Sequence, residues 1–332
     1  MRIVIAMYDG KNAFPSPYDW AMVAGAIWLL RKWRKKVGEK GRGQREEPAP
    51  MAAAMILSLT GEARCGKVGI KGARVDLEKD PMTIEVTARG GGQGSAEMTT
   101  GFAAAACVHT VLSGERSPEE REEGITLLES FDEIREEMAA TDLRGKHTGK
   151  EETAEEVAED RRLVEMLKRA MLRYRRNQRG LKDQVPWKAV ENEKEWEEKV
   201  YSVAKQHRDD IRRAMKEWGE KGKNIDRETM TEEGYADDEL ALGGAVRAII
   251  RIVNHATLMT RIGVEPSPAK CEVLTSPEMD RDIDEIIEPL RGERTRDENG
   301  KLSPKHWPVS RKAKHLGVII AVDRGVMREG LV

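Results

Sequence analysis

The chain has 332 residues, enough for about two domains of average size or for one domain that carries a large insertion. Apolar residues make up 39% of the chain and charged residues 35%, which leaves enough apolar side chains for at least one core and excludes a wholly disordered protein. The 57 Lys and Arg side chains are balanced by 59 Asp and Glu, so a polyanion such as a nucleic acid would have to bind at a local site.

Three cysteines lie far apart in the sequence, at Cys65, Cys107 and Cys271, without the paired spacing of a zinc site or a redox dithiol. The longest apolar run, residues 21–30, is well short of the ~20 residues that span a bilayer. The apolar stretch at residues 3–7 is too short for a signal-peptide core. We therefore expect an intracellular protein that does not enter a membrane. The basic stretch 31–36 is too short to decide between nucleus and cytoplasm.

The N-terminal part of the chain alternates apolar runs with glycine. Residues 2–8 are rich in β-branched and apolar side chains and end at Asp9-Gly10, which predicts a short buried strand followed by a turn. A helix is expected over 18–36, because its last turn is basic as the helix dipole favours. Residues 81–88 alternate like a half-buried strand, and 95–112 resemble a buried helix of small residues.

A highly charged helical region follows, over residues 114–232. Ser117-Pro118-Glu119-Glu120 has the pattern of a capping box with proline at the first helical position. Two apolar stripes recur at helical spacing farther on, the first comprising Val157, Val164, Leu167, Met171 and Tyr174 and the second Trp196, Val200, Val203, His207, Ile211, Ala214 and Trp218. Long amphipathic helices, broken near 145–151 and 180–186, are expected to pair as a hairpin or small bundle.

The C-terminal part becomes apolar again after Gly234. Residues 240–262 are expected to form one packed helix, while 271–274 and 315–320 have the composition of strands. The apolar core is therefore expected to be split by the charged region.

A pair of adjacent carboxylates, Asp237 and Asp238, follows Tyr235-Ala236 and suits the tip of a β-hairpin, although such a pair is also common on an ordinary acidic surface. Its meaning depends on the landmarks that accompany it. In chain order these are Tyr8-Asp9-Gly10-Lys11-Asn12-Ala13-Phe14, Arg89-Gly90-Gly91-Gly92-Gln93-Gly94, Tyr235-Ala236-Asp237-Asp238, Pro268-Ala269-Lys270-Cys271 and Lys314-His315-Leu316-Gly317-Val318. This series resembles the palm motifs of reverse transcriptases of the non-LTR retrotransposon type.

The resemblance implies a metal site. Asp9 matches the first-motif aspartate and Asp237 the first aspartate of the Tyr-x-Asp-Asp box, with Asp238 beside it and the Gly10 backbone as a further ligand. In the family these residues bind two Mg²⁺ or Mn²⁺ ions, which clamp the attacking 3′-oxygen and the leaving oxygen in an in-line displacement. Hard oxygen ligands suit these metals.

Further roles follow from the same resemblance. Phe14 corresponds to the steric gate against a ribose 2′-hydroxyl, and the alternative is a core phenylalanine. Gln93, Gly94 and Tyr235 correspond to residues that contact the nucleotide and template, where glycine allows close approach of the backbone. Lys270 corresponds to the general acid for pyrophosphate. The turn at Leu316 and Gly317 corresponds to the hairpin that grips the primer.

The chain also departs from the family pattern. Only eight residues precede Asp9 and few follow Val318, so fingers and thumb are expected to be missing. The second motif continues as Ser95-Ala96-Glu97-Met98 instead of Pro-Leu-Ser, and the charged helices stand where the family has a much shorter connection. Because phosphoryl transfer depends on positioning and electrostatic stabilisation, these departures bear directly on activity.

We therefore expect an α+β fold in which a palm-like antiparallel sheet is backed by helices. Residues 1–113 and 233–332 would form the palm, and 114–232 a charged helical insertion. The predicted function is RNA-directed DNA polymerase activity, with an RNA template, a DNA primer and deoxynucleoside triphosphates as partners and with self-association through the insertion. One alternative is an inactive retrotransposon remnant that binds nucleic acid through Arg31–Lys36. The other is a helical scaffold whose working part is 117–231.

Overall fold

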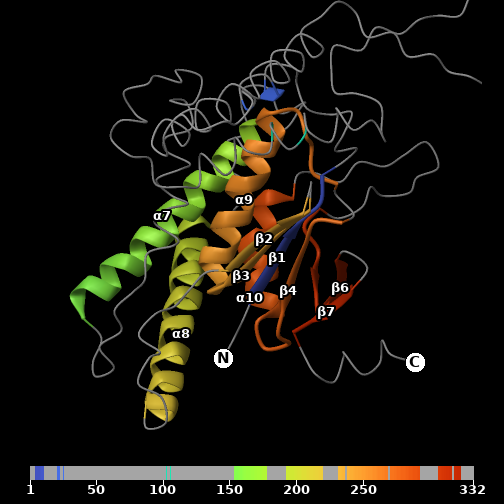
Figure 1. Cartoon of the computed structure of the whole chain (residues 1–332). Coiled ribbons are helices and arrows are strands. Elements are labelled where there is room, and N and C mark those ends of the chain that lie inside the picture. Colours follow the sequence, from blue (N-terminus) through green and yellow to red (C-terminus); the bar gives the residue numbers. More distant parts are fainter. Residues whose placement is uncertain are drawn as a thin grey trace, which may run out of the picture. The chain divides into compact units, whose positions relative to one another are not determined.

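The computed structural model describes residues 4–10, 153–177, 192–219, 231–235, 238–267, 270–291, 306–315 and 318–322, and positions 21, 22, 25, 102 and 105. These residues form an α+β structure, drawn in Figure 1. Its elements in chain order are β1 (Val4–Tyr8), α7 (Ala154–Asn177), α8 (Glu193–Gly219), β2 (Thr231–Tyr235), β3 (Asp238–Gly243), α9 (Ala245–Arg261), β4 (Glu272–Thr275), α10 (Asp280–Ile287), the 3-10 turn η2 (Glu288–Leu290), β5 (Val309–Ser310), β6 (Lys312–His315) and β7 (Val318–Ala321).

Five strands form one sheet in the order β2-β3-β1-β4-β5. The pairs β2–β3, β3–β1 and β1–β4 are antiparallel, whereas β5 runs parallel to β4. The expected all-antiparallel sheet is therefore wrong at this edge, and the sheet is mixed. The reason is connectivity, since α10 and η2 carry the chain back along the sheet before β5 begins, as a parallel connection requires.

Strand β1 is buried along its whole length because both of its faces are covered, which explains its unbroken apolar sequence. On one face, Ile5 and Met7 pack in an apolar cluster with Ala313 of β6 and Ile320 of β7. On the opposite face, the Tyr8 ring contacts His255 of α9. In Figure 1 the helices accordingly lie on one side of the sheet and the β6–β7 hairpin on the other.

Helix α9 is the central helix, with every residue from Ala245 to Met259 buried. It contacts β1 and β3 of the sheet as well as α7 and α8. The sequence predicts one helix over 240–262, and that prediction is wrong at its start, because Leu240 and Leu242 lie on β3. The glycine pair at 243–244 separates strand from helix, and alternation along β3 turns both leucines toward the β6–β7 hairpin.

Helices α7 and α8 confirm the amphipathic pattern of the charged region. Both begin with a side-chain cap: the Glu156 amide donates to Thr153 Oγ1 at 3.2 Å, and the Glu195 amide to Asn192 Oδ1 at 3.4 Å. Among the stripe residues whose burial is described, the buried ones are Val164, Leu167, Met171, Tyr174, Trp196, Val200 and Val203. The side chains of Ile211, Ala214 and Trp218 lie outside the described part of the chain. The α7 stripe does not face solvent, because α7 packs along α9.

The segment after α10 is held by Arg291, which is buried. Its guanidinium donates to Asp284 Oδ1 at 2.6 Å, to Glu288 Oε2 at 2.8 Å and to the Trp307 carbonyl at 2.9 Å. Trp307 has a φ of 51°, a left-handed conformation that is unusual for a side chain of this size. Its indole N–H donates to the Tyr174 hydroxyl at 3.2 Å, so the turn is tied to α7 as well.

By its packing the chain divides into two compact units. One comprises residues 1–11, 111–261 and 265–332, and it contains all the elements named above. The other comprises 12–110 and 262–264, where the described positions 21, 22 and 25 and 102 and 105 are helical and buried, as expected there. The domain boundaries expected at 113 and 233 remain a prediction, but α7 and α8 belong to the same unit as the sheet. None of the described helices is long and apolar enough to cross a membrane.

Candidate active site at the Asp9 end of the sheet

Three sequence motifs meet at the end of the sheet where β1 terminates. Asp9 directly follows β1, Asp238 is the first residue of β3, and Lys270 lies in the turn before β4. Because β3 and β4 both pair with β1, the sheet brings these residues to one place although Asp9 and Lys270 are 261 positions apart. We call this place the Asp9 end of the sheet.

The backbone of Asp9 is held by the chain around β4. Its carbonyl accepts a hydrogen bond from the Ser267 amide at 2.8 Å, and its amide lies 3.5 Å from Cys271 Sγ. The next residue, Gly10, forms an isolated antiparallel bridge with Pro266. These contacts extend the order of the sheet beyond the last residue of β1.

The Asp9 carboxylate forms an ion pair with Lys270. Lys270 Nζ lies 2.9 Å from Oδ2 and 3.2 Å from Oδ1 of Asp9, so both oxygens accept from the ammonium. The Asp9 side chain is only 18% exposed, whereas that of Lys270 is 66% exposed. The carboxylate is thus largely withdrawn from water, and its cation partner is not.

Asp238 is the cross-strand neighbour of Asp9. The β1–β3 register pairs Tyr8 with Glu239, and its continuation by one residue brings Asp9 opposite Asp238. Alternation along β3 turns the Asp238 carboxylate to the face that carries Leu240, which is the face covered by the β6–β7 hairpin. Directly opposed residues of this kind have Cβ atoms about 4.5–5.5 Å apart.

The hairpin β2–β3 carries the Tyr-Ala-Asp-Asp sequence. Tyr235 pairs with Asp238, which leaves Ala236 and Asp237 as the two residues that connect the strands. The β-hairpin expected at this sequence is therefore confirmed by the pairing of β2 with β3. Asp237 itself lies outside the described residues.

The charges of both carboxylates act on the thiol of Cys271. Burial raises the pKa of the Cys271 thiol to about 12, and the negative charges of Asp9 and Asp238 add to this increase. Hydrogen bonds with the backbone of Asp9 and Ser267 lower the pKa and offset part of it. Cys271 is a free cysteine that is 1% exposed. It is thus a neutral, inert packing group behind the Asp9 carboxylate.

A second polar layer lies on the opposite face of the same strands. Tyr8 and His255 are in edge contact with ring centroids 4.8 Å apart, and His255 Nδ1 lies 4.0 Å from Glu239 Oε2. Glu239 and His255 are both buried, and burial raises the pKa of Glu239 to about 7. The two layers are thus one residue apart in the sequence: Tyr8 of β1 directly precedes Asp9, and Glu239 of β3 directly follows Asp238.

The structure places some of the residues expected at the site and leaves others undescribed. Asp9, Gly10, Asp238 and Lys270 lie at the same end of the sheet, and Tyr235 lies on β2 beside them. The remaining expected site residues, Phe14, Gln93, Gly94, Asp237, Leu316 and Gly317, lie outside the described residues. Within the described ranges no three His, Cys, Asp or Glu side chains are grouped to hold a metal ion, and Asp237, an expected ligand, lies outside those ranges.

Sequence reasoning missed Cys271, Glu239 and His255 as parts of this site. Period-two alternation was the signal for Glu239, because a residue next to Asp238 on a strand must point to the opposite, helix-covered face. His255 stands within the largely apolar stretch 248–259, where Arg251 is the only other titratable side chain. The role of Cys271 depends on the pairing of β1 with β4, which no local pattern reports.

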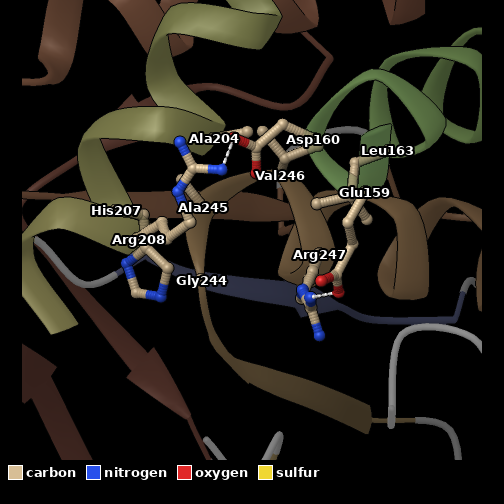
Figure 2. Close-up of a pocket in the computed structure, with 10 residues that line it drawn as sticks. All are labelled: Glu159, Asp160, Leu163, Ala204, His207, Arg208, Gly244, Ala245, Val246 and Arg247. Atoms are coloured by element: carbon tan, nitrogen blue, oxygen red, sulfur yellow. Dashed lines mark hydrogen bonds and ion pairs between the residues drawn. The ribbon is translucent and has the colours of Figure 1, made fainter. Parts of the chain in front are cut away.

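A small pocket lies elsewhere, at the other end of β3 (Figure 2). Residues from α7, α8 and the start of α9 line it, and their charges are paired across the helices: Arg208 Nη1 lies 2.7 Å from Asp160 Oδ2, and Arg247 contacts Glu159. The length of β3 separates this pocket from Asp238, so it does not belong to the Asp9 end of the sheet. Its paired acids and bases join three helices.

Comparison of the chain with protein-family models, with curated proteins and with solved structures finds no match.

Proposed function

We propose that the chain is the palm of an RNA-directed DNA polymerase, which joins a deoxynucleoside triphosphate to a primer 3′-hydroxyl on an RNA template. One observation carries the proposal: Asp9, the Tyr235–Asp238 hairpin and Lys270 meet at one end of one sheet. These are the first, third and fourth of the motifs that resemble the palm series. Their order along the chain did not require that they be neighbours in space.

The strand arrangement supports the same proposal. Strand β1, which ends just before Asp9, lies between β3 of the aspartate hairpin and β4, which follows Lys270, so the three motifs are on adjacent strands. Helices cover one face, and the β6–β7 hairpin, whose sequence contains the primer-grip-like residues, covers the face to which Asp238 turns. A primer end held by that hairpin would therefore be on the carboxylate side of the sheet.

The residues present fit a pair of hard divalent cations. Asp9 and Asp238 offer carboxylate oxygens and Gly10 a backbone carbonyl, which are the donors that Mg²⁺ and Mn²⁺ prefer. The Lys270 ammonium already lies against both Asp9 oxygens, so the structure shows a cation bound at this carboxylate. When bound, two such ions would activate the 3′-hydroxyl and stabilise the leaving pyrophosphate.

The protein groups supply positioning. The backbone contacts of Asp9 with Ser267 and Cys271 fix the carboxylate relative to β4, and the β1–β3 pairing fixes it relative to the hairpin. Lys270 holds a proton at Nζ beside the Asp9 carboxylate, and a Lys270 side chain that leaves Asp9 could pass this proton to a leaving pyrophosphate. Such preorganisation is the main protein contribution to phosphoryl transfer.

Primer extension tests the proposal. We expect the full chain, with Mn²⁺ or Mg²⁺ and deoxynucleoside triphosphates, to extend a DNA primer on an RNA template, and Asp237→Asn to lower the rate at least about 100-fold because a metal ligand is lost. Asp282→Asn, on α10, removes a carboxylate of the same size from another element and should leave the rate unchanged. Equal extension by wild type and Asp237→Asn would refute the metal role.

Localised cleavage by iron provides a test that needs no substrate. Fe²⁺ bound at the site, with ascorbate and peroxide, should cut the backbone near residues 9 and 237, and Asp9→Asn should abolish the cuts. An inactive remnant would instead show salt-sensitive nucleic-acid binding without extension. Iron cuts that do not change in Asp9→Asn would place the metal elsewhere and contradict the proposal.

Among the described residues of α7 and α8, the contacts do not favour the helical-scaffold alternative. The apolar stripe of α7 is already covered by α9, and the Trp196 indole of α8 donates to the Ile286 carbonyl of α10 at 3.0 Å. These faces of α7 and α8 therefore pack against other elements of the same chain.

A further inference from the structure

The Asp9–Lys270 ion pair joins two groups with opposite relations to solvent. The carboxylate is 18% exposed and lies on backbone that is held by Ser267 and Cys271, whereas the lysine side chain is 66% exposed. The Asp9 carboxylate is therefore fixed in place, whereas the Lys270 side chain can move away from it into solvent. A long lysine side chain gives up a surface contact at little cost, because water solvates its ammonium.

The Asp9 carboxylate needs a cation where it lies. Asp238 is its cross-strand neighbour, and both charges act on the buried Cys271 thiol, so two negative charges share one partly desolvated end of the sheet. Like charges at such a position repel, and withdrawal from water adds to the cost. The ammonium of Lys270, within hydrogen-bond distance of both Asp9 oxygens, relieves this repulsion.

The same oxygens are the ones that a divalent cation requires. An ammonium that contacts both oxygens of a carboxylate occupies the region where a metal would bind, and two cations cannot share that region without strong repulsion. We propose that Lys270 is a removable counter-ion of Asp9: it neutralises the carboxylate until a divalent cation binds, and the cation displaces it. This inference rests on the proposed function.

Displacement gives Lys270 a second position. Its ammonium can neutralise Asp9 or meet a bound triphosphate, but one ammonium cannot do both at once. Cation binding thus releases the lysine for the substrate, so the site acquires its proton donor only when the cation is in place. The device also keeps the Asp9 carboxylate neutralised in the apo site.

A Mn²⁺ titration of the full chain tests the competition directly. Free Mn²⁺ is followed by its electron paramagnetic resonance signal, without nucleotide or nucleic acid, so the readout is affinity and not activity. Lys270→Gln removes the competing charge and should tighten Mn²⁺ binding about tenfold. Lys270→Arg keeps the charge and should stay within about threefold of the wild type.

Lys199→Gln is the matched control, because Lys199 forms an ion pair with Glu285 between α8 and α10, and its loss should not change Mn²⁺ affinity. Asp9→Asn separates the two proposals. If Asp9→Asn weakens Mn²⁺ binding and Lys270→Gln does not tighten it, the counter-ion role is overturned while the metal site stands. If Asp9→Asn leaves Mn²⁺ binding unchanged, the metal site fails, and the counter-ion role fails with it.

Lysine reactivity gives a second readout on the wild-type chain. Mn²⁺ should raise the acetylation of Lys270 by acetic anhydride several-fold, measured by mass spectrometry, because the released amine loses its carboxylate partner. Acetylation of Lys199 serves as the internal reference. A Lys270 signal that is unchanged or lowered by Mn²⁺ would overturn the displacement.

Discussion

Glu239 and His255 form a buried acid–base pair one residue away from the proposed metal carboxylates. Their side chains lie 4.0 Å apart, between Nδ1 and Oε2, and the Tyr8 ring contacts the imidazole. Burial raises the pKa of the Glu239 carboxyl from 4.5 to about 7. The folded chain therefore binds a proton between these pH values that the unfolded chain has released.

The sign of the stability effect follows from that proton. Because the folded state binds more protons than the unfolded state between pH 4.5 and 7, the free energy of unfolding falls as the pH rises through this range, by on the order of 2–3 kcal/mol. Glu239→Gln should abolish most of this fall, whereas Glu278→Gln, on an exposed residue, should retain it. Urea unfolding at pH 5, 6, 7 and 8 measures the effect, and a wild type that becomes more stable from pH 5 to 8 would contradict it.

The Arg208–Asp160 ion pair, which joins α8 to α7, is buried on both sides. Arg208→Met leaves the buried Asp160 charge without this guanidinium and should lower the free energy of unfolding by about 3–5 kcal/mol. The double variant with Asp160→Leu should recover most of that loss, because no charge is then buried. Arg213→Met removes an arginine that is 64% exposed and should cost less than about 1 kcal/mol in the same urea titration. Equal losses in the two single variants would argue against the buried pair.

At the scale of elements, helix α7 contributes buried side chains to the core. Leu167 is fully buried on α7, which packs along α9, so Leu167→Ala should lower the free energy of unfolding by about 2–5 kcal/mol. Glu165→Ala changes an exposed residue of the same helix and should cost less than about 0.5 kcal/mol. Thermal and urea unfolding followed by circular dichroism measure both. A loss of less than about 1 kcal/mol in the free energy of unfolding of Leu167→Ala would contradict a core role for α7.

The elements differ in how well their sequences predict them. β1 was predictable because apolar β-branched residues run up to an Asp-Gly turn, and the α7 and α8 stripes because their spacing is helical. The start of α9 was not, because Leu240 and Leu242 suit the apolar faces of a helix and of a strand alike. Only the pairing of β1 with β3 selected the strand.

At the scale of the whole molecule, the described helices of the charged region depend on the sheet-bearing part of the chain. Trp196 donates to the Ile286 carbonyl on α10, Tyr174 accepts from Trp307, and Arg173 Nη2 donates to Asn254 Oδ1 on α9 at 3.2 Å. These contacts cross from α7 and α8 to elements that follow residue 232.

An excised segment over residues 117–231 should therefore be largely unfolded and monomeric. It keeps the N-terminal caps of α7 and α8, but it loses α9, against which α7 packs, and isolated helices depend on such packing. Circular dichroism and sedimentation velocity measure helix content and mass, with the full chain as reference. A folded, self-associating segment would contradict this prediction and favour the helical scaffold.

The sequence by itself determined the local elements and the candidate groups. Apolar runs, helical spacing and turn residues specify β1, β4, α7, α8 and the β2–β3 hairpin, because these signals depend on neighbours within a few residues. It also singled out Asp9, Asp238 and Lys270 as groups of interest.

Only the tertiary structure decided which groups meet. The Asp9–Lys270 contact spans 261 positions, and the burial of Glu239 against His255 depends on the packing of α9 on the sheet. Such contacts arise from sheet pairing and packing over long chain separations, where local propensity carries no information. For the same reason, the raised pKa of Glu239 and the counter-ion role proposed for Lys270 follow from the structure and not from sequence pattern.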